Sequence, residues 1–289
     1  MTQARALVLA GGLALAAPAL PADGPVAPDR PTFSPGTVAV ERGRIQLEAG
    51  ASWGRDGAAR VLALGEALVR AGIYESIELR LGAASWVDVD APGGDASGIT
   101  DPIAGVKLEL VDYSYRWRPE SALVVETTVP VGSTEVGDEG WQPGAGLVLG
   151  WEAGPRTALG AFVGATRARA GGERFTRGFA AVSVSRAVTD DAGLFAELRA
   201  VDGGPGAGAA WHLLAGASRG VGDDLALDAW VEQRLDGRGP RYRLGVGLTR
   251  RWSRPQSGSG RSTSSRSSVI SRQAHSGPSR PAPERLTPP

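Results

Sequence analysis

The sequence predicts a single antiparallel transmembrane β-barrel, and two aromatic pairs are its clearest signature. Trp141 and Trp151 stand ten residues apart, as do Tyr242 and Trp252, with apolar residues at alternate positions between them. An even separation places both rings on one face of a strand. Ten strand residues rise roughly 33 Å and, at a tilt of about 40°, span about 25 Å, the height of the apolar band between two aromatic girdles. A strand of a soluble protein usually has about 5–6 residues.

About twelve runs with alternating character predict the strands. In the first run, Ile45 and Leu47 alternate with Gln46 and Glu48. A soluble sheet shows the same alternation, but no helical segment is present to cover so many apolar faces. The predicted strands are residues 43–53, 61–71, 77–88, 102–112, 120–130, 141–152, 157–167, 175–186, 192–201, 208–218, 224–235 and 241–252.

The connections between these runs alternate in length, which predicts how the barrel is oriented. Membrane barrels have short periplasmic turns and longer outer loops. With the first strand running outward, the short connections and both ends of the barrel lie in the periplasm, and an even number of strands closes the sheet. The short connections are 72–76, 153–156, 187–191 and 219–223, and the longer ones are 54–60, 89–101, 131–140, 168–174 and 202–207.

The segments that flank residues 43–252 have other compositions. Residues 1–22 predict a secretory signal peptide, because Arg5 precedes an apolar run with small residues near its end. This signal predicts export to the outer membrane of a Gram-negative bacterium. Residues 23–42 are rich in proline and predict an extended periplasmic leader. Residues 253–289, with six arginines and one glutamate among Ser and Pro, predict a disordered basic tail.

Composition excludes several kinds of site. The chain has no cysteine, so it carries no disulfide scaffold, thiolate metal site or cysteine nucleophile. The net charge is zero, but without residues 253–289 it is about −5, and the tail has no aromatic residue to suggest nucleic-acid binding. We predict no cofactor and no metal. The expected partners are outer-membrane lipid, the barrel-assembly machinery and a small-molecule solute.

The parity of the strands predicts which residues face lipid and which line the lumen. Apolar faces should contact lipid, so the opposite faces should point inward. The predicted aromatic girdle consists of Trp53, Trp141, Trp151, Tyr242 and Trp252. The predicted lumen-lining residues are Arg44, Gln46, Glu48, Glu78, Arg80, Lys107, Glu109, Glu126, His212, Asp228, Glu232 and Arg243.

These interior residues leave several functions open. Interleaved charges can pair into a filling that plugs a structural barrel, or they can line a path for small molecules. A hydrolase is a further alternative, because His212 could act with Ser218 or Ser185, although nothing in the spacing singles those serines out. A soluble, secreted all-β protein is another alternative.

Four stretches resemble, in the same order, the outer-membrane transporter family of the putative MetA-pathway of phenol degradation. They are residues 64–72 (LGEALVRAG), 77–82 (IELRLG), 97–107 (SGITDPIAGVK) and 127–132 (TTVPVG). The resemblance implies a barrel that moves small, often aromatic, molecules, and it implies no catalytic residue.

Two features of the sequence depart from the pattern of that family. Val131 replaces the usual threonine in the last stretch, and residues 253–289 follow Trp252. The resemblance implies a barrel that finishes at a terminal aromatic residue read by the assembly machinery. Three alternatives follow: Trp252 is read internally, the tail is trimmed, or the reading frame ends elsewhere.

Overall fold

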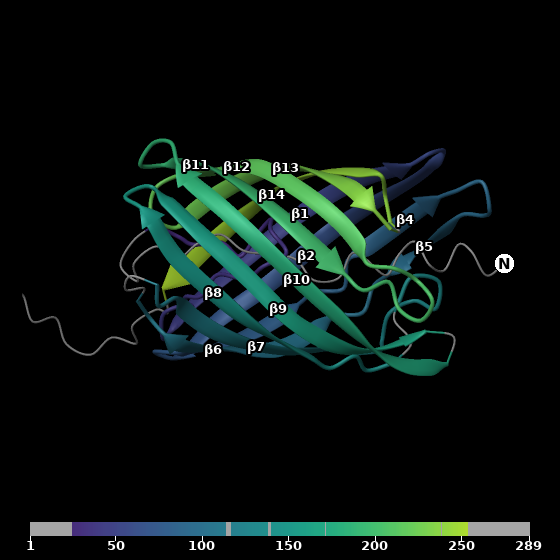
Figure 1. The fold of residues 1–289 in the computed structure, drawn as a ribbon, viewed down its shortest axis with the longest axis horizontal. Helices are drawn as coiled ribbons and strands as arrows, with labels where there is room; N and C mark the ends of the chain where they lie inside the picture. The colour runs from purple at the N-terminus through teal and green to yellow at the C-terminus, as the bar shows by residue number, and fades with distance from the viewer. Residues whose placement is uncertain (1–24, 114–116, 138–139, 171, 238, 254–289) are drawn as a thin grey trace, which may run out of the picture. The chain divides into compact units, whose positions relative to one another are not determined.

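The barrel consists of strands that form one closed sheet (Figure 1). The computed structural model describes residues 25–113, 117–137, 140–170, 172–237 and 239–253. Its strands are β1 Arg44–Asp56, β2 Ala59–Tyr74, β3 Ile77–Gly82, β4 Trp86–Asp90, β5 Ala96–Ile99, β6 Ile103–Val111, β7 Glu120–Thr128, β8 Gly144–Gly154, β9 Thr157–Ala170, β10 Glu173–Ala187, β11 Ala192–Val201, β12 Ala210–Gly220, β13 Leu225–Asp236 and β14 Tyr242–Ser253. The predicted signal peptide, residues 23–24 of the predicted leader, and the tail from residue 254 onward lie outside the described residues.

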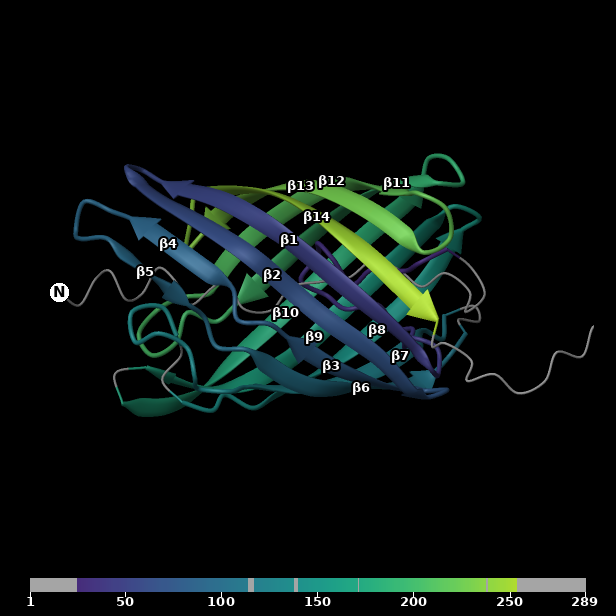
Figure 2. The same cartoon turned by 180° about the vertical axis from the view of Figure 1, so that it is seen from behind.

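Pairing between the first and last strands closes the sheet. Antiparallel neighbours follow one another around the barrel, and β1 pairs with β14 from Arg44 opposite Ser253 to Arg55 opposite Tyr242 (Figure 2). Strands β3 and β4 pair with successive parts of the same strand, β2. Strand β5 pairs with β4, and β6 pairs with β3. The pairs β3–β4 and β5–β6 thus each fill the place of one strand. The prediction of a single antiparallel barrel of about twelve strands is confirmed.

Alternation of side chains between the two faces explains why these segments form a barrel wall. On β13, Asp228 and Glu232 point inward and are buried, whereas Leu227 and Val231 point outward and are each 47% exposed. Apolar side chains that are exposed on one face of a single-layered sheet have no protein to cover them. Their arrangement fits a wall that faces hydrocarbon.

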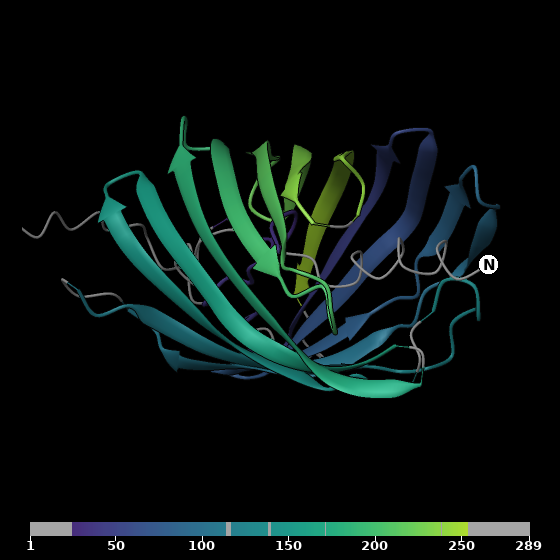
Figure 3. The same cartoon turned by 45° about the vertical axis from the view of Figure 1, so that its right-hand side comes forward.

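The strands tilt around the barrel, and several hairpins extend further than the sequence predicts (Figure 3). Segments 54–60 and 168–174 are predicted as loops, but β1 and β2 reach to within two residues of each other, as do β9 and β10. The prediction of long loops there is wrong. The outward residues at those tips are arginines, so the apolar alternation stops although the strands continue. Strand β5 and the end of β4 similarly occupy part of the predicted loop 89–101.

One end of the barrel carries the short turns between β2 and β3, β8 and β9, β10 and β11, and β12 and β13. We call it the short-turn end, and the opposite end, with the long hairpins, the long-hairpin end. Among the described residues, no helix is long and apolar enough to cross a membrane.

Candidate channel interior

Residues 25–43, which we call the plug segment, lie inside the barrel. The backbone N–H of Val26 donates to the carbonyl of Asp223, in the turn between β12 and β13, at 2.7 Å. The N–H of Gly43 donates to the carbonyl of Gly72, near the turn between β2 and β3, at 2.9 Å. The segment therefore enters and leaves at the short-turn end. Most of its side chains from Val26 to Val40 are buried.

This position corrects the predicted periplasmic leader. Proline-rich composition correctly indicates a segment without regular structure, but it carries no signal for where the segment lies. The carboxylates that bind the segment lie on strands from β1 to β13, between 18 and 198 residues away, so they do not appear in its local composition.

Asp29 of the plug segment lies among three buried cations of the wall. Its carboxylate is 2.5 Å from Arg80 Nη1 and 3.1 Å from Arg70 Nη1. Lys107 Nζ is 3.2 Å away. Burial alone raises the pKa of Asp29, but the charges of Arg70, Lys107 and Arg80 outweigh it and hold the pKa well below its usual range. Asp29 is therefore ionised at neutral pH and anchors the plug segment electrostatically.

Carboxylates of the wall accept hydrogen bonds from the backbone of the plug segment. Glu48 accepts the N–H groups of Asp29 and Arg30 at 2.9 and 2.8 Å. Glu78 accepts the N–H of Val40 at 2.8 Å. A backbone without secondary structure needs such partners when it is buried, because an unpaired N–H is costly. These inward acids thus replace the hydrogen bonds that a helix or strand would supply.

Two more contacts fix the first half of the plug segment. Arg30 Nε lies 3.4 Å from the Asp228 carboxylate, and its guanidinium rests against the backbone of β1 and β14. A Cβ atom at Gly50 or Gly247 would stand within 2.3 Å of that guanidinium. Further along, Glu197 accepts the N–H of Phe33 at 2.7 Å.

The ring of Phe33 packs into an apolar part of the interior. Its centroid lies 5.6 Å from that of Phe162 on β9 and 5.4 Å from that of Phe179 on β10, edge to face with the latter. The Arg199 guanidinium is 5.4 Å from the Phe33 centroid. Such aromatic and cation–π contacts each contribute about 0.5–1.5 kcal/mol beyond simple burial. The plug segment therefore presents charge to one part of the wall and an aromatic ring to another.

A small cavity of about 40 Å³ remains beside the plug segment at Thr37 and Glu120. Its opposite wall includes Gly150, Gly160 and Ser183. A space of this size holds roughly one or two water molecules. The plug segment therefore leaves little free space against the wall at this point.

The structure places the predicted lumen residues inside the barrel, with Arg44 at the rim of the short-turn end beside Glu41. Glu126 pairs with Arg80, and Glu109 is half-buried and accepts the N–H of Ala39 at 2.9 Å. Gln46 donates to Glu48 at 2.9 Å. The structure thus brings most of the predicted residues onto the plug segment rather than onto an open water-filled lumen.

A second ion-paired group lies nearer the long-hairpin end. Glu232 is 2.7 Å from Arg199 Nη2, 3.3 Å from His212 Nδ1 and 3.9 Å from Arg243 Nη1. Ser218 is six residues from His212 on β12, which corresponds to about 20 Å along a strand. The structure therefore does not bring Ser218 near His212.

The other serine proposed for a hydrolase is also remote. Ser185 on β10 lies opposite Phe195 on β11, whereas His212 lies opposite Arg199, four residues further along the same strand. That offset is about 13 Å along the strand direction alone. Among the described residues, no group of three His, Cys, Asp or Glu side chains could hold a metal ion.

Sequence analysis missed the aromatic side chains of the interior. Phe162 and Phe179 belong to one buried apolar cluster, and Phe195 and Trp230 to another. Strand parity could have revealed two of them, because Trp230 shares its face with Asp228 and Glu232, and Phe195 shares its face with Glu197. Glycines on neighbouring strands make room for the rings: a Cβ atom at Gly146 would lie 2.3 Å from Phe162, and one at Gly245 would lie 2.3 Å from Trp230.

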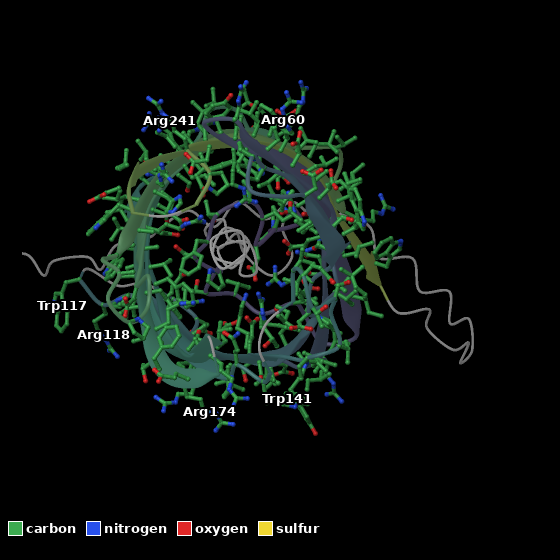
Figure 4. The ribbon with its side chains drawn as sticks, turned by 90° about the vertical axis from the view of Figure 1, so that its right-hand side faces the viewer. Arg60, Trp117, Arg118, Trp141, Arg174 and Arg241 are labelled. Atoms are coloured by element: carbon green, nitrogen blue, oxygen red, sulfur yellow. The ribbon has the colours of Figure 1, made fainter. Side chains whose placement is uncertain are left out.

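The predicted girdle residues lie on the outside of the barrel near its two ends. Trp53 and Tyr242, on paired strands, contact each other with centroids 5.7 Å apart near the long-hairpin end. Trp252 is 45% exposed at the short-turn end, where Trp151 Nε1 donates to the Trp117 carbonyl at 3.1 Å. Trp141 points away from the barrel (Figure 4).

The closed antiparallel wall, the exposed apolar belt and the charged interior together define the fold of an outer-membrane β-barrel. The chain belongs to the family described as "Putative MetA-pathway of phenol degradation", whose sequence model matches residues 28–252. The family resemblance drawn from the sequence is confirmed.

Solved structures of low sequence identity share the fold. An outer membrane channel from Pseudomonas putida F1 is 13% identical, with a TM-score of 0.56 over 81% of this chain and 100% of that chain. The NanC porin is 10% identical, with a TM-score of 0.50 over 71% of this chain and 98% of that chain. No curated protein matches the sequence. At these identities the likeness shows the fold alone.

Proposed function

We propose that the protein is an outer-membrane channel through which small molecules pass passively once the plug segment moves aside. One observation carries this proposal: within the barrel the wall holds the plug segment through side-chain contacts without strand pairing, and the backbone hydrogen bonds from Val26 and Gly43 to the wall lie at the short-turn end. The single backbone bridge, between Arg42 and Gly72, lies at the rim. A segment held this way can leave without breaking the sheet.

The charge balance of the interior supports a plug segment that can be displaced. Asp29 and Arg30 carry opposite charges, so their departure changes no net charge inside the barrel. Arg70 keeps Glu48 and Glu78 as partners at 2.9 and 2.8 Å after Asp29 leaves. Asp228 loses its partner Arg30, and Lys107 keeps only Glu78 at 3.9 Å, so the cost of opening is concentrated at these two residues and falls when water enters the vacated space.

The position of Phe33 supports an aromatic or hydrophobic solute. When Phe33 withdraws, it leaves a site beside the paired rings of Phe162 and Phe179, in which a solute ring finds the same tilted and edge-to-face contacts. Glu197 loses the N–H of Phe33 and can accept a hydrogen bond from a hydroxyl group instead. The family description points to the same class of molecule.

Uptake by proteoliposomes tests this function. We expect the wild-type protein to admit phenol faster than empty liposomes do, and Phe33→Ala to increase that rate by up to about 100-fold, because truncating a buried aromatic ring costs at least about 3 kcal/mol of packing. Phe195→Ala is the matched control, since Phe195 packs against Leu214 and Trp230 instead of the plug segment. Absence of both conductance and uptake in the wild-type protein and in Phe33→Ala would exclude a channel.

A structural barrel with a permanently plugged interior is the second candidate. The many contacts to Asp29 and Glu197 favour it, because they are numerous enough to hold the segment under all conditions. The same experiment separates the two candidates. We do not propose an enzyme; any hydrolase activity that persists unchanged in His212→Ala would exclude the residue on which that alternative depends.

A further inference from the structure

The outer surface of the β9–β10 hairpin changes sharply in character toward the long-hairpin end. Directly paired outward residues start with Leu159 opposite Val184 and continue through Val163 opposite Ala180. Val163 is 53% exposed, as expected for a side chain in contact with lipid tails. Beyond them the outward residues become arginine and threonine.

Arginine–threonine pairs mark the two edges of this apolar stretch. Arg186 lies opposite Thr157 at the short-turn side, and Arg167 lies opposite Thr176 at the other. In each pair the guanidinium donates to the threonine hydroxyl, at 2.9 and 3.1 Å respectively. The ten residues between Thr157 and Arg167 correspond to about 25 Å along the membrane normal at the usual tilt, which is the thickness of a barrel's apolar band.

Two further arginines stand one step beyond the apolar band. Arg169 and Arg174 are directly opposite each other on the exposed face of the hairpin. Like charges in this position destabilise a strand pair unless an anion lies between them. Arg169 Nε donates to the carbonyl of Gly172 at 3.1 Å, and Arg174 points away from the barrel (Figure 4).

No carboxylate among the described residues lies within ion-pair distance of Arg167, Arg169 or Arg174. Asp202, which directly follows the neighbouring strand β11, accepts the N–H of Gly204 at 3.0 Å. Three guanidinium groups thus share the outer face of the hairpin just beyond the apolar band, and among the described residues no carboxylate neutralises them.

We propose that Arg167, Arg169 and Arg174 form a binding site for the phosphate groups of a phosphorylated glycolipid in the outer leaflet. A guanidinium group offers a planar pair of N–H donors that matches a phosphate. Below the arginines, the apolar band receives the acyl chains of the same lipid. The adjacent Trp141, 61% exposed, supplies the aromatic group that prefers this interface.

The first hairpin repeats the arrangement. Arg55 and Arg60 are directly opposite each other at the tip of β1 and β2, just beyond Trp53, and Arg55 Nε donates to the carbonyl of Gly57 at 2.8 Å. Here Asp90 on β4 lies opposite Arg60 and supplies a nearby acid. Within the part of the chain that the structure describes, no acid lies directly opposite an arginine of the β9–β10 site, so this site is the one to test.

Binding of diphosphoryl lipid A to the purified, detergent-solubilised full chain tests the proposal, with dephosphorylated lipid A as the comparison ligand. We expect the wild-type protein to bind the diphosphoryl form preferentially. Arg169→Gln combined with Arg174→Gln should weaken that binding by at least about tenfold, because both substitutions remove charge-assisted hydrogen bonds to the phosphate groups. The double substitution to lysine should retain part of the affinity, because charge remains but the planar fork is lost.

The matched control removes two exposed arginines from the short-turn end, Arg156→Gln with Arg186→Gln, and should leave lipid A binding unchanged. Heat-modifiable mobility on unboiled gels verifies that every variant is folded. The proposal is overturned if the wild-type protein binds both lipid forms equally, or if the two double variants lose affinity to the same extent.

Discussion

Replacing Asp29 with asparagine should release the plug segment, because one side chain connects it to three cations of the wall. Removing one member of a buried ion pair typically costs about 3–5 kcal/mol. Arg70 and Arg80 both retain Glu78 at 2.8 Å, whereas Lys107 retains it only at 3.9 Å. We therefore expect the lower end of that range, about 3 kcal/mol, which shifts the docking equilibrium by about 100-fold.

The absence of cysteine makes this shift measurable, since a single introduced thiol is the only reactive one. A Val38→Cys reporter lies in the plug segment between Asp29 and the rim. Its rate of labelling by a thiol reagent follows the undocked fraction when docking equilibrates faster than labelling. Asp29→Asn should raise that rate by about 100-fold, with a matching rise in single-channel open time.

Asp56→Asn is the control for that experiment, because Asp56 pairs with Arg234 on the wall at 3.1 Å. A labelling rate in Asp29→Asn within about threefold of the parent, or an equal rise in Asp56→Asn, would refute electrostatic anchoring of the plug segment; a threefold change is only about 0.6 kcal/mol.

The other predictions concern pH and close backbone approaches. The pKa of Asp29 is lower when the plug segment is docked than the usual aspartate value of about 3.9, so ionised Asp29 stabilises docking at any pH above that value. This stabilisation is lost as the pH falls through the lowered pKa. Conductance that depends on the release of Asp29 should therefore stay unchanged from pH 8 to about 5 and rise only in stronger acid. Gly247→Ala should loosen docking by displacing the Arg30 guanidinium and so speed the labelling of the reporter thiol. Gly146→Ala should instead destabilise the barrel by about 1–3 kcal/mol, because the added methyl group overpacks against the Phe162 ring, and a lower thermal transition should report it. Gly178→Ala is the control: the space around Gly178 is open, so this substitution should change neither the labelling rate nor the thermal transition.

The barrel itself could be predicted because its physical cause is local. Because lipid lies on one side of the wall and a closed interior on the other, apolar and polar side chains alternate along every strand. The neighbours Leu227 and Asp228 show this alternation. The strand ends were predicted less well, because beyond the membrane both faces are wet. Arg169 and Arg174 extend their strands without any apolar residue to show it.

The content of the interior could not be predicted from the same pattern. Parity identifies Glu48 and Glu197 as inward-facing, but it does not reveal that their partners are backbone N–H groups of residues 29–34. That pairing joins segments more than a hundred residues apart in one case, and an irregular chain has no periodicity to read. Prolines in the plug segment indicate an extended conformation, which fits both a periplasmic leader and an interior filling.

Residues 25–43 enter and leave the barrel at the same end, the short-turn end. This path allows the sheet to close and the lumen to be sealed in two separate events. A chain that threaded through the barrel would have to be enclosed before β1 meets β14. A loop that turns back needs no such order: the sheet can close first, and the loop can enter afterwards through the open mouth beside Asp223 and Gly72. Insertion into the bilayer and sealing of the lumen are therefore separable steps, and a freshly assembled molecule can pass through a leaky stage before it becomes tight.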